Sequence, residues 1–247
     1  MDKCRKKQTE KKLKRFHHKF TLPAILILLA AAIGLLFAGI NNMRNQTTLP
    51  PNGTASAIGV ELNQSFGFID LHELQANGVS FVYLRGTQGR SYFDDDYLTY
   101  RDQILGTKMA FGTIVAYSNE STPLQHYQFF MKKVGTNTGS LPIWIEPAID
   151  DYDLNYIKQM AQFASMLQQQ NKRVMVDVDI KYKKYFGQDV QFITGGRKAP
   201  NKLQYSFWRY TNNGRVKSVR NFENGVTMLT YNGTVTQYKE KYGQLTQ

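Results

Sequence analysis

Four acidic residues stand at or near the ends of apolar, strand-like runs: Glu61, Glu146, Asp177 and Asp179. Two carboxyl groups that face each other across a cleft can hydrolyse a glycosidic bond. One protonates the leaving oxygen, and the other stabilises positive charge on the sugar or acts as base or nucleophile. Aromatic side chains near the same strand ends could stack on sugar rings: Tyr92, Trp144, Trp208 and Tyr210. The alternative is structural, because such acids also cap helices and bind loop backbone.

The sequence carries no motif for metal, nucleotide or serine-nucleophile chemistry. The four histidines, at 17, 18, 72 and 126, lack metal-ligand spacing. The glycine-containing run 86–89 lacks the spacing and the lysine of a phosphate-binding loop. The acidic run 94–96 could hold calcium, but it also suits the N-terminus of a following helix, and we favour the helix. We therefore expect no cofactor and no metal.

The residues that must position these groups alternate between apolar and amphipathic runs. Strands are expected at 57–62, 79–84, 109–117, 141–146, 173–179, 190–194, 203–210, 226–231 and around 233–235. Helices are expected at 70–76, 97–105, 122–134 and 154–170. Repeated strand–helix units with continuous apolar strands predict a parallel sheet covered by helices. We expect an α/β fold, an irregular and incomplete (β/α) TIM-like barrel whose functional residues lie at the C-terminal ends of its strands. The alternative is an open doubly wound sheet.

The N-terminal region reads as a membrane anchor. Residues 1–19 contain nine Lys or Arg and two acids, and residues 20–40 carry no charge. As a helix, those 21 residues span roughly 31 Å, close to the thickness of a bilayer's hydrocarbon core. The basic cluster predicts a single-pass protein with a cytoplasmic N-terminus and an exported C-terminal part. A cleaved signal peptide, with Ala38 before a cleavage point, is the alternative, and it exports the same part.

The remaining chain divides into a tether and one domain. Residues 41–56 are polar with Pro50 and Pro51, which suits a tether, and residues 57–242 are enough for one core. The basic tail carries +7 of the net +12, so we expect it to contact anionic lipid and expect no nucleic-acid partner. Cys4 is the only cysteine and lies in the tail, so the exported domain has no disulfide.

Five segments, taken in order, resemble those of a known family. They are GVELNQSFGFIDL (Gly59–Leu71), GVSFVYLRGTQGRSYFDDDY (Gly78–Tyr97), LPIWIEPA (Leu141–Ala148), FWRYTNNGRV (Phe207–Val216) and NGTV (Asn232–Val235). This series resembles glycoside hydrolase family 25, the muramidases of the lysozyme M1 type. The resemblance implies an irregular (β/α) barrel that cleaves the β-1,4 bond between N-acetylmuramic acid and N-acetylglucosamine in peptidoglycan. It also implies the cell envelope of a bacterium, a Gram-positive one in the simplest case.

The same resemblance implies changes at the catalytic positions. The family's first-strand Asp is Glu61 here, and in its fourth-strand Asp-x-Glu pair the Asp is Glu146 and the Glu, the expected proton donor, is Ala148. A misplacement of about 1 Å can cost on the order of 10²-fold in rate. One hypothesis is a working muramidase, with Glu146 as acid and Glu61, Asp177 or Asp179 as its partner. The other is a catalytically degenerate barrel that binds glycan or an envelope protein. The expected substrate-binding residues are Gln88, Tyr92, Asp94, Asp177, Trp208 and Tyr210.

Overall fold

The computed structural model describes residues 21–39, 46–51, 56–222 and 224–243, in two compact units that divide between Gln46 and Thr47. In the first unit, Thr21–Gly39 form a helix of mean hydropathy 2.5, long and apolar enough to cross a membrane. Residues 1–19, the expected cytoplasmic tail, lie outside the described residues, as do Phe20 and Ile40 at the ends of the expected span.

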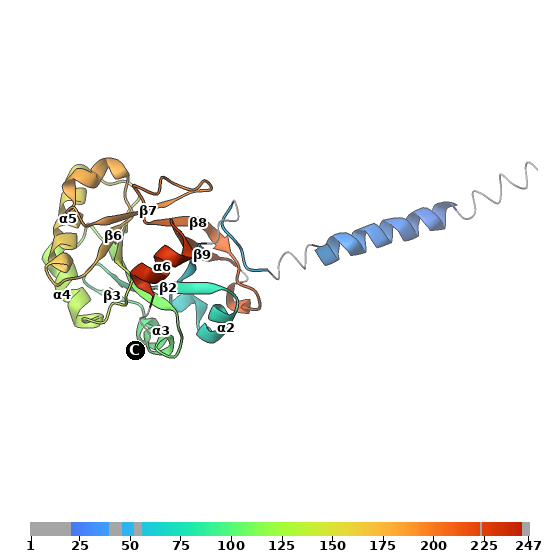
Figure 1. Ribbon diagram of the computed structural model, residues 1–247, viewed down its shortest axis with the longest axis horizontal. Coiled ribbons are helices and arrows are strands. Elements are labelled where there is room, and N and C mark those ends of the chain that lie inside the picture. The colour runs from blue at the N-terminus through green and yellow to red at the C-terminus, as the bar shows by residue number, and fades with distance from the viewer. Residues whose placement is uncertain (1–20, 40–45, 52–55, 223, 244–247) are drawn as a thin grey trace, which may run out of the picture. The chain divides into compact units, whose positions relative to one another are not determined.

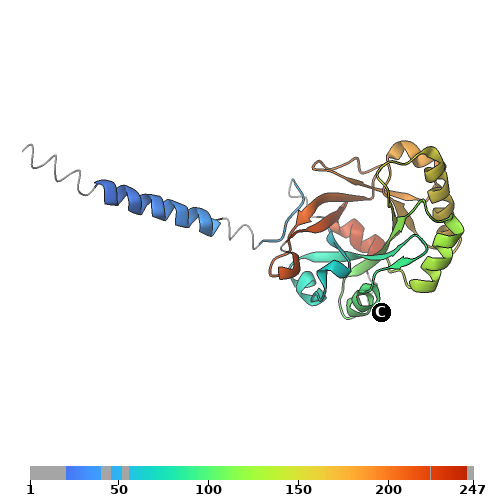
Figure 2. The same ribbon diagram turned by 180° about the vertical axis from the view of Figure 1, so that it is seen from behind.

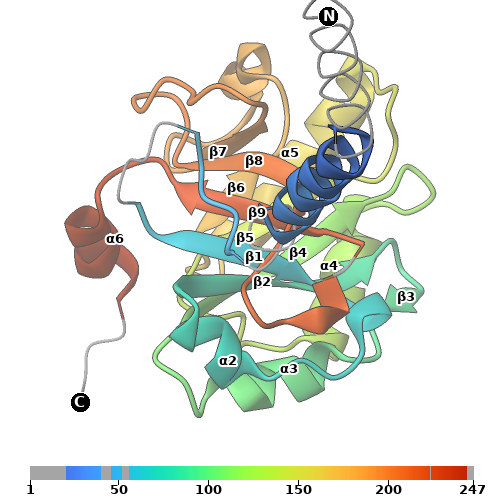
Figure 3. The ribbon, with the colours of Figure 1, turned by 90° about the vertical axis from the view of Figure 1, so that its right-hand side faces the viewer.

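In the described part of the second unit, eight strands close into a barrel (Figures 1 and 3). They are β1 (Ile58–Leu62), β2 (Val79–Gln88), β4 (Ala110–Tyr117), β5 (Ile143–Pro147), β6 (Val174–Val176), β7 (Gln191–Gly195), β8 (Phe207–Gly214) and β9 (Val226–Tyr231). Seven of these strands run parallel, and β9 runs antiparallel to both of its neighbours, β8 and β1. The pairing of β1 with β2 closes the ring and excludes the open doubly wound sheet. A short β3 (Tyr92–Phe93) adds to the end of β2.

Helices cover the outside of the barrel. They are α2 (Leu71–Ala76), α3 (Tyr97–Ile104), α4 (Pro123–Lys133) and α5 (Leu154–Gln168). Side chains cap the starts of α2, α4 and α5. Figure 2 shows α4 in green and α5 in yellow against one side of the barrel. The Thr122 side chain closes a capping box with Gln125, and the Asp153 carboxylate accepts the Tyr156 N–H at 2.8 Å. Short 3₁₀ helices η1 (Gln64–Phe66), η2 (Ile180–Tyr185) and η3 (Arg220–Phe222) complete the connections.

The strand expected around residues 233–235 is wrong. A helix, α6 (Val235–Tyr242), begins there, because Thr234 and Gln237 form a capping box. Tyr238 and Tyr242, four residues apart, share one helical face and are buried. Their hydroxyl groups reach the Ser80 carbonyl and the Gln191 side chain, which lie where β2 and β7 begin. Helix α6 therefore plugs the barrel at the end where the parallel strands start (Figure 3).

Alternation along the strands separates an inner core from an outer one. The inner core consists mainly of large side chains: Phe81, Tyr83, Ile114, Trp144, Met175, Ile193, Phe207 and Leu229. Phe81 stacks on Tyr238 with ring centroids 5.5 Å apart. Space is so limited that a Cβ on Gly112 would lie 2.4 Å from the Tyr83 ring. The inner core is thus a packed layer that leaves only the opposite end of the barrel, the mouth, for polar groups.

Part of the expected tether is bound to the barrel. The Thr48 N–H donates to the Arg215 carbonyl at 2.8 Å, and the Arg215 N–H donates to the Thr48 hydroxyl at 3.0 Å. The Tyr210 hydroxyl donates to the Thr48 carbonyl at 2.8 Å. The second unit therefore begins at Thr47, before the domain boundary expected at residue 57.

We expect Tyr238→Ala to lower the free energy of unfolding by about 3–5 kcal/mol, since it empties the space between α6 and the inner core. Chemical denaturation measures the change. Lys239→Ala, at an exposed position of the same helix, is the control and should change stability by less than about 0.5 kcal/mol. Equal effects of the two substitutions would contradict the plug.

Candidate active site

Five ionisable side chains form one layer at the mouth, on top of the inner core. We call Glu61, Arg85, Glu146, Asp177 and Arg209 the charged layer. Each stands two residues after an inward-facing position, as Arg85 follows Tyr83 and Glu146 follows Trp144, so strand alternation turns it inward. The layer lies at the C-terminal ends of β1, β2, β5 and β6 and against β8. The sequence prediction that Glu61, Glu146 and Asp177 share this end agrees with the structure.

Two arginines hold the three carboxylates of this layer. Arg85 Nη2 lies 2.5 Å from Glu146 Oε1 and 3.5 Å from Glu61 Oε1. Arg209 Nη1 lies 3.1 Å from Asp177 Oδ2, and its guanidinium group lies over the Trp144 ring at 5.8 Å. These charged side chains are between 12% and 27% exposed, so they are shielded yet open to a ligand from the mouth.

The surroundings raise the proton affinity of two of the carboxylates. Burial, with the nearby charge of Glu146, raises the pKa of Glu61 to about 7, although Arg85 and Arg209 oppose the change. Burial raises the pKa of Asp177 to about 6 against the pull of Arg209. Glu146, by contrast, makes the shorter contact with the Arg85 guanidinium. Near neutral pH the layer therefore combines a carboxyl group that can hold a proton with a carboxylate that is directly ion-paired.

The spacing of Glu61 and Glu146 restricts the chemistry. Both contact the same nitrogen of Arg85, so their two Oε1 atoms are no farther apart than the sum of those contacts, about 6 Å. Carboxyl groups of retaining glycosidases are about 5–5.5 Å apart, and those of inverting enzymes about 6.5–9.5 Å apart. The upper limit for this pair lies below the inverting range and includes the retaining one.

Two of the expected substrate-binding residues lie beside the charged layer. Gln88 and Tyr92 line a cavity of about 320 Å³ on the rim of the mouth, together with residues of the β4–α4 loop. Burial raises the pKa of the Tyr92 phenol, and the positive charge of Arg85 acts against that increase. Asp94 does not face this cavity, because it is fully buried and accepts the backbone N–H groups of Gln64 and Asp96. Asp94 ties two loops together, so the structure gives it a structural role where we expected contact with substrate.

The expected aromatic platform is not assembled at the mouth. Trp208 is 2% exposed and donates its indole N–H to the Gly196 carbonyl, and Tyr210 is 6% exposed and bound to the tether. Phe207 and Arg209 point inward, so these two side chains must point outward. Trp144 does point inward but is fully buried beneath the charged layer. Asp179, the fourth acid, is exposed and caps η2.

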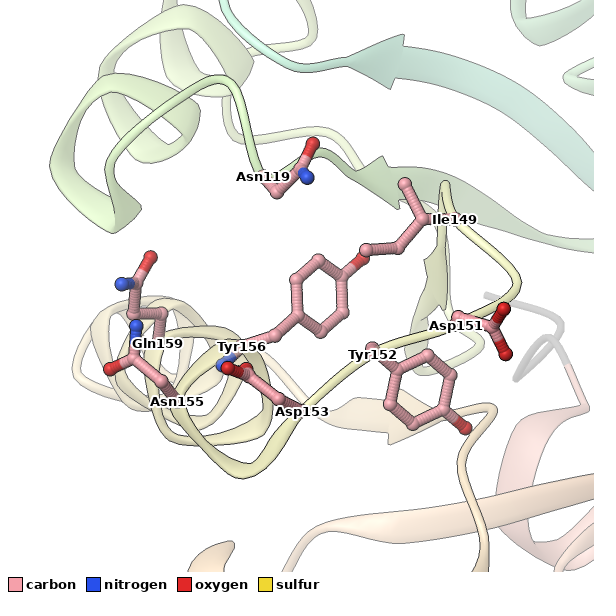
Figure 4. Close-up of a pocket in the computed structure, with 8 residues that line it drawn as sticks. All are labelled: Asn119, Ile149, Asp151, Tyr152, Asp153, Asn155, Tyr156 and Gln159. Carbon is pink, nitrogen blue, oxygen red and sulfur yellow. The ribbon is translucent and has the colours of Figure 1, made fainter.

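A second rim cavity, of about 390 Å³, lies beside Ile149, the residue after Ala148 (Figure 4). Its lining consists of Asn119, Ile149, Asp151, Tyr152, Asp153, Asn155, Tyr156 and Gln159. Tyr152 stacks on Tyr156 with ring centroids 5.6 Å apart, and the Ala148 N–H donates to the Tyr156 hydroxyl at 3.2 Å. Amides, carboxylates and an aromatic face suit a polar ligand such as a sugar or a peptide. Across the described chain, no three His, Cys, Asp or Glu side chains gather as metal ligands.

Sequence reasoning gave no role to Arg85 and Arg209, which hold the site together. A signal was present, since each arginine interrupts an apolar strand at a position that alternation turns inward. A charged residue at such a position needs a partner of opposite charge.

We expect the stability of the protein to depend on pH through Glu61. Its pKa is about 7 in the folded state against an ordinary 4.5, so its contribution is full below pH 4.5 and is lost as the pH rises through about 7. The loss is on the order of 3 kcal/mol. Glu61→Gln should flatten this decline in urea denaturation between pH 5 and 8, while Asp179→Asn, at an exposed site, should leave it intact. An unchanged slope in Glu61→Gln would refute the assignment.

Comparison with known proteins shows which family this barrel resembles. A model of glycosyl hydrolases family 25 matches residues 61–219. A family 25 glycosyl hydrolase from Bacillus anthracis is 16% identical over 81% of this chain and 98% of its own, with a TM-score of 0.59. The bacterial lysozyme from Streptomyces coelicolor is 18% identical over 76% of this chain and 98% of its own, with a TM-score of 0.61. A family GH25 lysozyme from Aspergillus fumigatus is 14% identical over 76% of this chain and 100% of its own, with a TM-score of 0.57.

At these identities the structures establish the fold alone. A comparison with curated protein sequences finds no match. The family model nevertheless covers well over half of the chain, and the closed eight-stranded barrel agrees with it. The chain belongs to glycosyl hydrolases family 25.

Proposed function

We propose that this protein is a membrane-anchored muramidase that hydrolyses β-1,4 bonds of cell-wall peptidoglycan at its barrel mouth. The observation that carries the proposal is the Glu61–Arg85–Glu146 arrangement, a carboxyl pair within about 6 Å at the C-terminal ends of barrel strands. Family membership supports it, as do similar structures named lysozyme or muramidase from Streptomyces coelicolor and Trichobolus zukalii. The two rim cavities, which both adjoin the β4–α4 loop, give a glycan strand room beside the pair.

The contacts favour Glu61 as the acid and Glu146 as its ionised partner, the reverse of the assignment that the resemblance suggested. Burial raises the pKa of Glu61 to about 7, so it can hold a proton near neutral pH, and Glu146 makes the shorter ion pair with Arg85. Glu61 gives its proton to the glycosidic oxygen as the bond from that oxygen to the anomeric carbon breaks. The Glu146 carboxylate stabilises the positive charge that develops on the sugar. Water then adds to the anomeric carbon and returns a proton to Glu61, which restores the site.

The N-terminal helix supports an anchored, extracellular location. Thr21–Gly39 have the length and composition of a membrane span, although a signal sequence shares both properties. Because Thr47 is bound to the barrel, only residues 40–46 lie in the sequence between the helix and the barrel, and a chain of that length spans roughly 30 Å at most. An anchored barrel would therefore act on wall close to the membrane, as in a Gram-positive envelope.

The alternative is a barrel that binds glycan, or an envelope protein, without cleaving it. Two observations favour it: Ala148 stands where the resemblance expects the proton donor, and all three carboxylates of the charged layer are ion-paired with arginine. An ion-paired carboxylate is a weaker nucleophile and base, so the same geometry can serve recognition.

The test is release of reducing sugar from purified peptidoglycan by the full chain in detergent micelles. We expect Glu61→Gln and Glu146→Gln each to lower the rate by on the order of 10²–10⁴-fold, because each removes one half of the pair. The control Asp179→Asn should keep full activity, since Asp179 is exposed outside the charged layer. If both Gln variants keep wild-type rates, the pair is not catalytic.

If the wild-type chain does not cleave peptidoglycan, two further measurements decide between the two functions. Sedimentation with peptidoglycan in the absence of cleavage, with activity gained in Ala148→Glu, would establish the binding module. Failure both to cleave and to bind would show that peptidoglycan is the wrong ligand.

The pH dependence tests the assignment of roles within the pair. If Glu61 is the acid, the rate should fall as the pH rises through about 7, by about tenfold per unit above it, because only the protonated form donates. Initial rates between pH 5 and 9 measure this. A rate that rises over that range would instead require Glu61 to act ionised.

A further inference from the structure

The positive charge of the exported part is concentrated in one stretch of the chain. Residues 57–247 contain 21 Lys or Arg and 17 Asp or Glu. Residues 172–202 alone contain eight basic and three acidic residues, while the rest has 13 basic and 14 acidic ones. The net charge of +4 therefore comes entirely from this stretch.

Six exposed side chains of this stretch form what we call the basic rim: Lys181, Lys183, Lys184, Arg197, Lys198 and Lys202. The first three lie on η2, which follows β6, and the others lie on the connection that follows β7. Both segments leave the barrel at its mouth, because β6 and β7 are parallel strands that end there. Tyr205 of the β7–β8 connection lies against the Ile180 backbone, which joins the two segments.

The basic rim is mostly unneutralised. Lys181 pairs with Asp179 at 3.3 Å, and within the described chain none of the other five side chains has an ion-pair partner. Two of the lysines make cation–π contacts with the tyrosine that follows them. Lys181 Nζ lies 5.0 Å from the centroid of the Tyr182 ring, and Lys184 Nζ lies 5.2 Å from that of Tyr185. Tyr182 in turn lies 6.2 Å from Tyr152, which lines the cavity in Figure 4. The rim thus continues directly into the mouth.

The basic rim follows two neighbouring strands around the mouth. The connection after β6 carries three of its six side chains, and the connection after β7 carries the other three. The bound part of the tether contacts the next strand, since Thr48 bonds to Tyr210 of β8 and to Arg215. The charges therefore form a row along the mouth, which suits an extended chain of negative charges.

We propose that the basic rim binds an anionic, phosphodiester-linked polymer of the cell envelope beside the mouth. Unpaired lysines spread along two segments suit a flexible chain of repeated charges, since an ammonium group needs no fixed bidentate geometry. A positive surface at the edge of a cleft also raises the local concentration of anions. This interaction goes beyond the proposed hydrolysis and does not depend on it.

The experiment measures binding of synthetic poly(glycerol phosphate) to the full chain in detergent micelles. The test variant replaces Lys183, Lys184, Arg197 and Lys198 by Gln. The matched control replaces Lys108, Lys132, Lys158 and Lys239 by Gln, which removes the same charge from exposed positions elsewhere. All chains keep the basic N-terminal tail, so the difference between variants reports the rim. We expect at least about tenfold weaker binding in the test variant, less than about twofold in the control, and weakening with salt.

Three outcomes would overturn the proposal. The first is that the wild-type chain does not bind the polymer. The second is that the test and control variants lose polymer binding equally. The third is that the test variant binds phosphatidylglycerol vesicles more weakly than the wild type does but binds the polymer equally well. If the quadruple variant does not fold, the pair Lys183→Gln and Lys184→Gln is compared with Lys108→Gln and Lys132→Gln.

Two further measurements distinguish failure of the polymer-binding proposal from failure of the proposed hydrolysis. Glu146→Gln should bind the polymer as the wild type does, and the rim variant should cleave polymer-free peptidoglycan at the wild-type rate.

Discussion

The guanidinium group of Arg85 lies between two carboxylates that would otherwise repel each other in a shielded site. Placing Glu61 and Glu146 within about 6 Å without a cation between them would require both to give up much of their hydration for no attraction. Arg85 makes the arrangement possible, and it does so unequally, since the contact with Glu146 is 1.0 Å shorter. Burial, with the nearby charge of Glu146, raises the pKa of Glu61 to about 7, which suits a group that must donate a proton near neutral pH.

The barrel beneath the layer fixes Arg85 in place. Its strand is paired on both sides, with β1 and β4, and the preceding inward residue is Tyr83, packed against Trp144 and Phe207. The bulky inner core fills the barrel beneath the charged layer, and α6 closes its far end. Closure of β1 on β2 sets Glu61 beside Arg85, because Glu61 pairs with Tyr83 and Arg85 lies two residues farther along β2. The site thus depends on the whole ring of strands.

The sequence was sufficient for the parallel strands, since their continuous apolar runs have few other interpretations, and for the clustering of acids at their ends. The strand–helix units also favoured a barrel over an open sheet, and the β1–β2 pairing confirms the barrel. Helix α6 was missed although Thr234 and Gln237 carry a capping signature, because a short apolar run before them suggested a hairpin. Trp208 and Tyr210 were misplaced for a different reason: a strand end was treated as one position, whereas alternation sends neighbours to opposite faces.

Charge balance gives a physical reason why Glu61 carries the proton. The charged layer contains two arginines and three carboxylates, so it is neutral when one carboxyl group is protonated. Burial penalises net charge and raises the pKa of Glu61 to about 7 and that of Asp177 to about 6, so Glu61 takes up a proton at a higher pH than Asp177 does. A glutamate at position 148 would add a fourth carboxylate and require either a second proton or a third cation. Ala148 is therefore compatible with an acid that has moved to Glu61, and the alanine alone does not show that the site lacks a proton donor.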